Sequence, residues 1–398
     1  MSPEQRSHSC CGGEPTENLK MEKILGVSAH AEGNEMVYCR LIGETDTLDD
    51  WKWLPVKAEQ HGMAPLFLRH LLTIDALIPH EILRELRALA VRHRMANQVR
   101  TKALCEILDA CQSKEIRVLV LKGAALAHLV YPEPGLRPMR DIDLLVSKQD
   151  GARAQALLMD LGFEIDPVES LPLPPRHHHL PIASRTDKGL RVSVEIHTDL
   201  FPQTRYYRSK TFEDLEPRST EFKLGDQNAF TLGIEDMLWH VYRHAVGPPL
   251  LASPLRYIHV ADVISIVEKY AESIDWRMLQ NRYPRIVNIL PALNLLSPFS
   301  ESTLRKLPFI QGEMLPSVGE DYSGWPRRMV QFNFTKSSAE ALRRTFNPPE
   351  WWLRLYYGGG GKPAWFWHRC IRHPLHIFEW VFHLTKTRIT GLRSPRLA

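Results

Sequence analysis

The spacing of hydrophobic residues changes twice along the chain and divides it into segments. Over residues 46–113 apolar residues recur every three or four positions, which predicts amphipathic helices. Over residues 114–232 short aliphatic runs alternate with turn residues, which predicts buried strands separated by helices. Helical spacing returns over residues 233–300. The pattern therefore predicts a sheet-containing core between two helical segments.

The central segment contains all of the predicted strands. They are expected over residues 118–121, 141–146, 179–184 and 191–197. Helices over residues 124–129 and 150–161 separate the first three strands, and a Gly-containing turn joins the last two. These elements make a small α/β unit. Residues 202–232, rich in Pro and charge, are interpreted as a connector.

The two ends of the chain have weaker patterns. Residues 1–45 are polar, contain Gly and are weakly periodic, which predicts a mobile or loosely packed arm. Residues 301–398 begin as irregular sequence and end as an aromatic and basic segment. We therefore expect an α+β fold in which a small mixed sheet is flanked by N- and C-terminal helical segments.

Composition narrows the class of protein. Hydrophobic residues make up 44% and charged residues 24% of the 398 residues, which favours a folded core over a disordered chain. No apolar run is long enough for a spanning helix, and the first residues lack the apolar region of a secretory signal. The six cysteines are then expected to be reduced thiols in a cytoplasmic protein. A net charge of +4 is too weak to argue for a nucleic-acid partner.

Two aspartates form the first candidate for chemistry. Asp141 and Asp143 are two positions apart on a predicted strand, so both carboxylates should face the same way. Like charges this close repel unless a cation lies between them, and Mg²⁺ prefers carboxylates together with substrate phosphates. The alternative is a solvated strand end with no ligand.

A turn and two arginines add candidate phosphate contacts. Lys122-Gly123 lies where a strand gives way to a helix, and a glycine there lets a ligand approach free backbone N–H groups. Arg137 and Arg140 directly precede the aspartates, and guanidinium groups suit bidentate contact with phosphate. A salt bridge to a neighbouring acid is the alternative for both arginines.

A third acid lies on the last predicted strand. Glu195 and His197 alternate with apolar neighbours, so they should share one face of that strand. If this strand lies beside the one that carries Asp141 and Asp143, Glu195 completes a group of three carboxylates.

These motifs together resemble a known family. The signature of the uncharacterised nucleotidyltransferase family, of the polymerase-β superfamily, is similar to three runs of this chain: Leu121-Lys122-Gly123-Ala124-Ala125-Leu126, Tyr131-Pro132 and Leu136-Arg137-Pro138-Met139-Arg140-Asp141-Ile142-Asp143-Leu144-Leu145-Val146. The resemblance extends upstream to Trp51 and downstream to Trp276, so it covers most of residues 50–290.

The resemblance implies a nucleotidyltransferase-type core and a role for each motif. Gly123 is the turn that holds a nucleoside triphosphate, Asp141 and Asp143 hold Mg²⁺ in a two-ion site, and Glu195 is the third acid. The superfamily's turn commonly continues with Ser or Gly, whereas this chain has Ala124, so Lys122 is expected to supply the missing phosphate contact. His197 and Tyr131 are candidate substrate contacts.

The implied activity is Mg²⁺-dependent transfer of a nucleoside monophosphate from a nucleoside triphosphate, with ATP as the expected donor. The acceptor is left open among a small molecule, a sugar, a peptide and a protein. The alternative is a non-catalytic nucleotide-binding or scaffold protein that keeps the fold, and the turn at Ala124 is its main support.

The C-terminal segment allows several interpretations. Residues 351–398 contain eight Lys or Arg and one acid, Glu379. Aromatic residues lie among them: Trp351, Trp352, Tyr356, Tyr357, Trp365, Phe366, Trp367, Trp380 and Phe382. They could cover the core of the helical part, contact an anionic membrane peripherally or stack on RNA. Nucleic acid is the least favoured of these partners.

Overall fold

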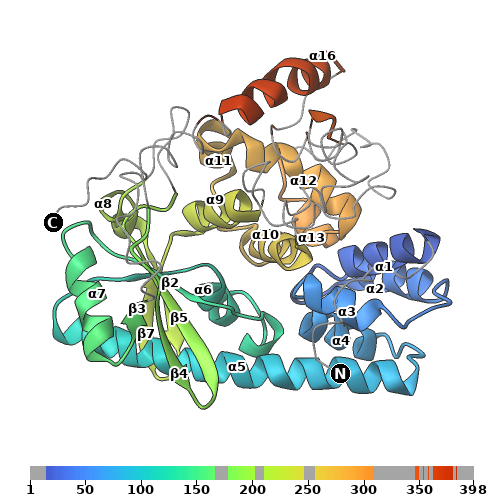
Figure 1. The fold of residues 1–398 in the computed structure, drawn as a ribbon. Coiled ribbons are helices and arrows are strands. Elements are labelled where there is room, and N and C mark those ends of the chain that lie inside the picture. Colours follow the sequence, from blue (N-terminus) through green and yellow to red (C-terminus); the bar gives the residue numbers. More distant parts are fainter. Residues whose placement is uncertain are drawn as a thin grey trace.

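The computed structural model describes residues 15–165, 178–201, 210–245, 256–308, 346–348, 353, 357, 362–379 and 382. Within them a seven-stranded mixed sheet is combined with many helices (Figure 1). The α+β class expected from the sequence is confirmed. No helix in the described part of the chain is long and apolar enough to cross a membrane.

The chain begins with helices. These are α1 (Pro15–Val27), α2 (Glu35–Thr45), α3 (Leu54–Gln60), α4 (Ala64–Thr73) and α5 (His80–Ser113). Helix α5 is much the longest, and it runs from the N-terminal helices to the sheet (Figure 1). Leu86, near its start, packs in one hydrophobic core, whereas Leu104 and Ile107, near its end, pack in another. One helix therefore joins two cores.

The sheet is built from seven strands in the order β3-β4-β5-β2-β1-β7-β6. Their bounds are β1 Leu119–Leu121, β2 Ile142–Leu145, β3 Glu164–Ile165, β4 Ala183–Asp187, β5 Leu190–His197, β6 Thr220–Leu224 and β7 Gln227–Thr231. Strand β2 lies between β1, which is antiparallel to it, and β5, which is parallel to it. This places the predicted aspartate strand at the centre of the sheet, beside the strand that carries Glu195.

The sheet has two different faces. Ile142, Leu144 and Val194 point to one face, where they form a core with α5 and with α7 (Gly151–Asp160). Leu121 and Leu145 belong to the other core, which contains the helices that follow the sheet. Because side chains alternate along a strand, Asp143 shares the face of Leu145. The polar positions of β2 and β5 therefore face the helical part of the molecule.

The segment interpreted as a connector contributes to the sheet. Strands β6 and β7 pair with each other within residues 202–232, and β7 extends the sheet beside β1. Phe222 and Leu224 alternate with the polar Glu221 and Lys223, so the period of two was present but was masked by the surrounding charge. The short α8 (Phe212–Leu215) and the 3₁₀ helix Glu216–Arg218 precede this hairpin.

Further helices follow the sheet. They are α9 (Ile234–Ala245), α10 (Tyr257–Tyr270), α11 (Trp276–Arg282), α12 (Pro284–Leu296), α13 (Glu301–Leu304) and α16 (Lys362–Trp367). The short α6 (Lys122–Leu129) and the 3₁₀ helix Pro134–Leu136 lie within the sheet segment. Helices α9 and α10 pack against each other, and α9 also contacts α6. They place helical surface next to the centre of the sheet.

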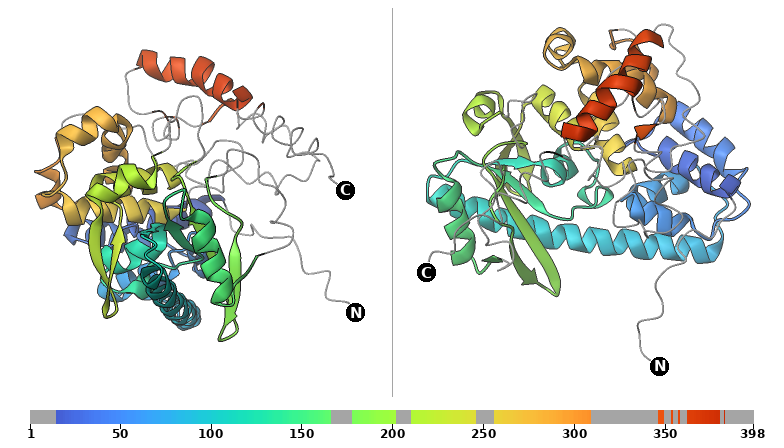
Figure 2. Two further views of the ribbon diagram at one scale, coloured as in Figure 1. Left: turned by 90° about the vertical axis from the view of Figure 1, so that its left-hand side faces the viewer. Right: turned by 45° about the horizontal axis from the view of Figure 1, so that its top comes forward.

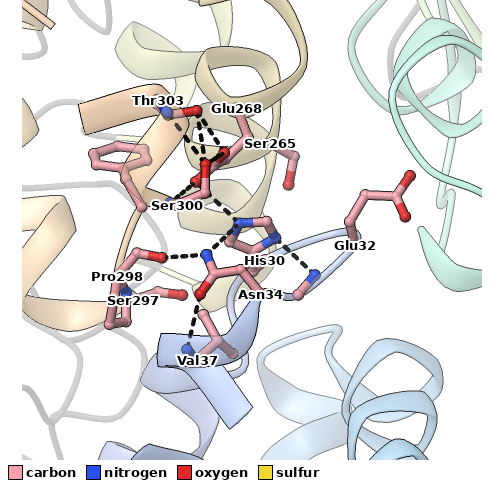
Figure 3. A network of polar contacts seen from close by, with 12 residues as sticks. His30, Glu32, Asn34, Val37, Ser265, Glu268, Ser297, Pro298, Ser300 and Thr303 are labelled. Carbon is pink, nitrogen blue, oxygen red and sulfur yellow. Dashed lines mark hydrogen bonds and ion pairs between the residues drawn. The ribbon is translucent and has the colours of Figure 1, made fainter. Parts of the chain in front are cut away.

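The prediction of a mobile arm over residues 1–45 is wrong for residues 15–45, and residues 1–14 lie outside the described part. His30, between α1 and α2, is almost fully buried, and its Nε2 lies 3.3 Å from Glu268 Oε1 (Figure 3). The Gly33 N–H donates to His30 Nδ1, which leaves the Nε2 proton for Glu268. Asn34 donates to the Pro298 carbonyl at 2.8 Å. Polar residues thus fix this segment to α10 and to the segment before α13.

Removing Glu268 is expected to weaken this attachment. Its carboxylate accepts from the Ser300 hydroxyl at 2.7 Å and the Thr303 hydroxyl at 2.6 Å, in addition to the contact with His30. Glu268→Ala leaves these donors without their acceptor, and we expect a loss of about 1–3 kcal/mol in the free energy of unfolding, measured in urea.

Glu272→Ala is the matched control, because the exposed Glu272 pairs only with the half-exposed Lys306 among the described residues. It is expected to cost under about 0.5 kcal/mol. Equal losses in the two variants would contradict the role given to Glu268.

Candidate functional site

The centre of the site lies where β1, β2 and β5 run side by side. Asp143 is the register partner of Glu195 across the parallel pair and of Leu121 across the antiparallel pair. His197 is two residues beyond Glu195 and faces the same side. The strand pairing that would bring Glu195 beside the aspartate strand is therefore confirmed.

Asp143 is buried, with 1% of its surface exposed, and it is bonded to two cationic or polar groups. Lys122 Nζ donates to Asp143 Oδ1 at 2.7 Å, and His197 Nε2 lies 2.9 Å from the same oxygen. His197 Nε2 is also 3.4 Å from Glu195 Oε2. Each carboxylate thus already has a hydrogen-bond donor within the protein.

The electrostatics of this group follow from burial and pairing. Burial by itself would raise the pKa of Asp143, but the charge of Lys122 and the hydrogen bond from His197 hold that pKa well below its ordinary value. Burial also opposes the charged form of His197, yet its bonds to Asp143 and Glu195 raise its pKa. For Lys122 the neighbouring acids likewise outweigh desolvation and raise the pKa. Asp143 is therefore ionised and Lys122 charged.

Asp141 lies just before β2 and is less buried than Asp143. The negative charge of Asp143, followed by desolvation, raises the pKa of Asp141 to about 6, and Glu195 acts in the same direction. The charges of Lys122 and Arg137 act in the opposite direction but do not cancel the rise in the pKa of Asp141. An added cation would relieve the repulsion.

Ligand atoms of Asp143, Glu195 and His197 all lie within 4.8 Å of one another. Two carboxylates at this spacing fit a hard divalent cation such as Mg²⁺. Asp141, predicted from sequence to share the site, is electrostatically coupled to it but is not part of this group. The ring of His197 also lies at ligand distance, and its predicted contact with substrate stays a prediction.

The turn after β1 has a sharp backbone conformation. Lys122 has a φ of 48°, in the left-handed region that non-glycine residues rarely adopt. This conformation aims the Lys122 side chain across to β2 while its backbone begins α6. Ala124 is buried in the core beneath the sheet, so its methyl group packs rather than facing the site. Only its backbone remains available for a ligand.

Two of the sequence-predicted residues, Arg137 and Tyr131, bond to Asp262, an acid with no role predicted from sequence. The Nε and Nη2 groups of Arg137 donate to Asp262 of α10 at 3.0 and 2.6 Å, and the Tyr131 hydroxyl donates to the same carboxylate at 2.8 Å. A Cβ on Gly123 would lie 2.6 Å from Arg137 Nη1, so the glycine makes room for this guanidinium. Arg137 thus forms the salt bridge named as its alternative, and the predicted phosphate contact of Arg137 and substrate contact of Tyr131 stay predictions.

Helix α5 fixes the loop that carries Arg137. Asn97, 2% exposed, donates to the carbonyls of Pro134 at 2.7 Å and Arg137 at 2.9 Å, and it accepts from the Met139 N–H. No site residue was predicted from sequence within this helix. An Asn in an otherwise helical pattern is the only sequence signal for this role.

Basic side chains continue from the site toward the N-terminal helices. Arg140 is exposed, and its charge acts on Arg256, at the start of α10, and on Glu59 of α3. Burial, together with Arg140 and Arg137, lowers the pKa of Arg256 to about 10, and a Cβ on Gly62 would lie 2.4 Å from its Nη2. Arg140 thus remains a candidate for contact with an anionic ligand, and Arg256 joins it.

Helix α9 places a buried histidine near the acidic group around Asp143. His240 is 1% exposed, and its Nε2 has no hydrogen-bond partner among the described residues. Burial, followed by the positive charge of Lys122, holds the pKa of His240 well below its ordinary value. A neutral imidazole with an unused nitrogen therefore lies near the acidic group.

Comparison with known proteins agrees with this picture. A family model described as an uncharacterised nucleotidyltransferase matches residues 47–288, which contain every site residue named above. No curated protein and no solved structure matches the chain.

Proposed function

The chain belongs to the family of uncharacterised nucleotidyltransferases, and on that basis we propose that it transfers a nucleoside monophosphate from a nucleoside triphosphate to an acceptor. The observation that supports this best is the pairing of Asp143 with Glu195 on adjacent parallel strands, with ligand atoms within 4.8 Å. We propose ATP as the donor and Mg²⁺ as the metal. The acceptor is a small molecule, a sugar, a peptide or a protein.

In this proposal each residue has a defined task. Asp143 and Glu195, helped by Asp141, would hold the metal ions, whose chemistry would be to supply positive charge to the reacting oxygens. The backbone at Gly123 and the side chains of Lys122 and Arg140 contact the triphosphate. His197 orients the two carboxylates through its shared hydrogen bonds.

The transfer step is an in-line displacement. The acceptor oxygen forms a bond to the α-phosphorus while the bond from that phosphorus to the bridging oxygen breaks, and pyrophosphate leaves. Glu195, whose side chain is 19% exposed and more accessible than that of Asp143, accepts the proton of the acceptor. Most of the rate enhancement comes from positioning and charge neutralisation.

Label transfer tests the activity without knowledge of the acceptor. The purified protein is incubated with Mg²⁺, fractionated cell extract and each nucleoside triphosphate, labelled at either the α- or the γ-phosphate. We expect the α-label alone to enter an acceptor fraction, while the γ-label leaves as pyrophosphate. Transfer of the γ-label would show a kinase, and transfer of neither label, with no binding of any nucleotide, would contradict the proposal.

Lys122 raises the alternative of a non-catalytic protein, because its ammonium already neutralises Asp143. We propose instead that Lys122 moves to the triphosphate when the metal and nucleotide arrive together. Lys122→Met should then bind Mn²⁺, a spectroscopic substitute for Mg²⁺, about tenfold more tightly than the wild type in the absence of nucleotide, as measured by electron paramagnetic resonance.

Lys148→Met is the control, because Lys148 pairs with Asp199 at 3.2 Å and is half-exposed outside the group. Its Mn²⁺ affinity should equal that of the wild type. If Lys122→Met bound Mn²⁺ with the affinity of the wild type, Lys122 and the metal would not compete for Asp143. That result would favour the non-catalytic alternative.

The location is proposed to be cytoplasmic. Cys39, Cys105, Cys111 and Cys370, the cysteines in the described part of the chain, are free thiols. Free thiols support a reducing compartment.

A further inference from the structure

The last described helix has an unusual distribution of side chains. It begins as α16, continues through a π-helical turn, His368–Arg372, and remains helical to residue 379. It lies at the outside of the molecule, on the side of α11 and α12 (Figures 1 and 2). Trp365 packs against the larger core, and Ile377 and His373 are buried. The helix is therefore attached along one face.

The outward face of this helix is apolar. Its large exposed side chains, with their exposed fractions, are Phe366 59%, Trp367 54%, Ile371 38%, Leu375 59%, Phe378 62% and Phe382 65%. From Trp367 onward they follow at intervals of four, four, three and four residues, which is one stripe of a helix. Within residues 363–379, the part of the helix whose burial is described, the remaining exposed positions are the uncharged Pro363 and Cys370. This stripe of six residues is called the apolar stripe below.

The two arginines of this helix, Arg369 and Arg372, lie over aromatic rings of the protein. Arg369 lies over the Trp365 ring at 4.8 Å, and Arg372 lies over the Tyr357 ring at 5.1 Å. Both arginines are only partly exposed. A surface helix of a soluble protein normally has the opposite arrangement, with apolar residues inward and charges outward. A contiguous exposed patch of large apolar side chains marks an interaction surface.

The net charge of residues 362–398 indicates which kind of partner the apolar stripe would bind. Residues 362–398 contain seven Lys or Arg and one acid, Glu379, a net charge of +6. Four of these cations, Lys386, Arg388, Arg393 and Arg396, follow directly after the apolar stripe in the sequence. Two copies packed stripe to stripe would bring +6 against +6, whereas an anionic lipid surface attracts each cation. Trp and Phe on the apolar face are typical of helices that lie in the membrane interface.

We propose that residues 362–382 bind the surface of an anionic membrane. The apolar stripe enters the boundary between headgroups and acyl chains, and the helix lies flat along about 24 Å of the surface. The net positive charge of residues 362–398 adds electrostatic attraction to the anionic surface. This inference uses residues outside the nucleotidyltransferase match and does not depend on the proposed function.

Vesicle flotation of the full-length protein tests the inference. We expect binding to phosphatidylcholine vesicles that contain about 30 mol% phosphatidylserine, little binding to pure phosphatidylcholine, and release as salt rises from about 0.1 to 0.5 M. Leu375→Asp/Phe378→Asp should lower the bound fraction at least about tenfold, since two apolar anchors are lost and two negative charges are gained.

The control is Leu77→Asp, which makes the same kind of change at a leucine that is 96% exposed outside this helix. It should bind vesicles as the wild type does. Binding that is equal in all variants, or equal on neutral and anionic vesicles, would overturn the proposal. So would concentration-dependent dimers in sedimentation that Leu375→Asp/Phe378→Asp converts to monomers, because the apolar stripe would then be an interface between copies of the chain.

Discussion

Replacing Asp143 with Asn is expected to lower nucleotidyl transfer by about 100- to 1,000-fold while the protein stays folded. The carboxylate lies at the centre of the group, bonded to Lys122 and His197 and opposite Glu195 in register. An amide keeps the size of the side chain and still accepts a hydrogen bond from Lys122, but it loses the charge that a metal needs. The rate of α-label transfer into the acceptor fraction measures the effect.

Controls must distinguish a loss of activity caused by unfolding from one caused by the missing charge of Asp143. Circular dichroism and thermal unfolding check that Asp143→Asn is folded, and the wild type alone should be stabilised by Mg²⁺ with nucleotide. Asp160→Asn makes the same change at an exposed residue at the end of α7 and should leave transfer unchanged. A folded Asp143→Asn variant with transfer within about twofold of the wild type would contradict the assigned role of the metal ligand.

Replacing Asp262 with Asn is expected to lower the free energy of unfolding by about 3–5 kcal/mol, a large share of the roughly 5–15 kcal/mol of a typical domain. The variant leaves Arg137, 8% exposed, charged and without its partner. The Tyr131 hydroxyl loses its charged acceptor at the same time. Urea unfolding measures the loss, and Asp226→Asn, in the exposed turn between β6 and β7, should change stability by less than about 0.5 kcal/mol.

A double variant then decides between two roles of Arg137. Arg137→Met/Asp262→Leu removes both charges and should recover most of the lost stability, because a buried ion pair can be replaced by apolar residues. If Arg137 acts only through the ion pair, stabilisation by Mg²⁺ with nucleotide should also return. If the double variant recovered its stability but did not bind nucleotide, the result would support the phosphate contact of Arg137 predicted from sequence. A double variant as unstable as Asp262→Asn would contradict the ion-pair account.

The sequence predicted the parts of the site that depend on local periodicity. A strand has a period of two, so the faces of Asp143 and Glu195 follow from their neighbours alone. The sequence did not show that the two strands are adjacent, and the predicted group of carboxylates depended on it. The structure shows that they are adjacent and parallel. Lys122 was expected to contact phosphate, and its left-handed φ and bond to Asp143 were not readable from its neighbours.

The parts that sequence analysis missed depend on packing between distant segments. Asp262 is 125 residues from Arg137, and nothing local identifies its partner. An acid inside the apolar run of α10 was a signal of buried charge, because such a residue needs a partner. His30 and Asn34 lie in the polar segment that was predicted to be a mobile or loosely packed arm. Their side chains bond instead to α10 and to the segment before α13. Their partners lie more than 230 residues away in sequence.

The long helix α5 has a consequence for how the protein unfolds. Its first half packs with the N-terminal helices and its second half packs beneath the sheet, with no break between them. Unfolding of the whole helix therefore removes a wall from both cores, so the chain should melt as one cooperative unit instead of domain by domain. A fragment that begins at residue 114, where the sequence pattern changes, would expose the underside of the sheet and should aggregate. The boundary visible in the sequence is thus not a boundary at which the protein can be cut.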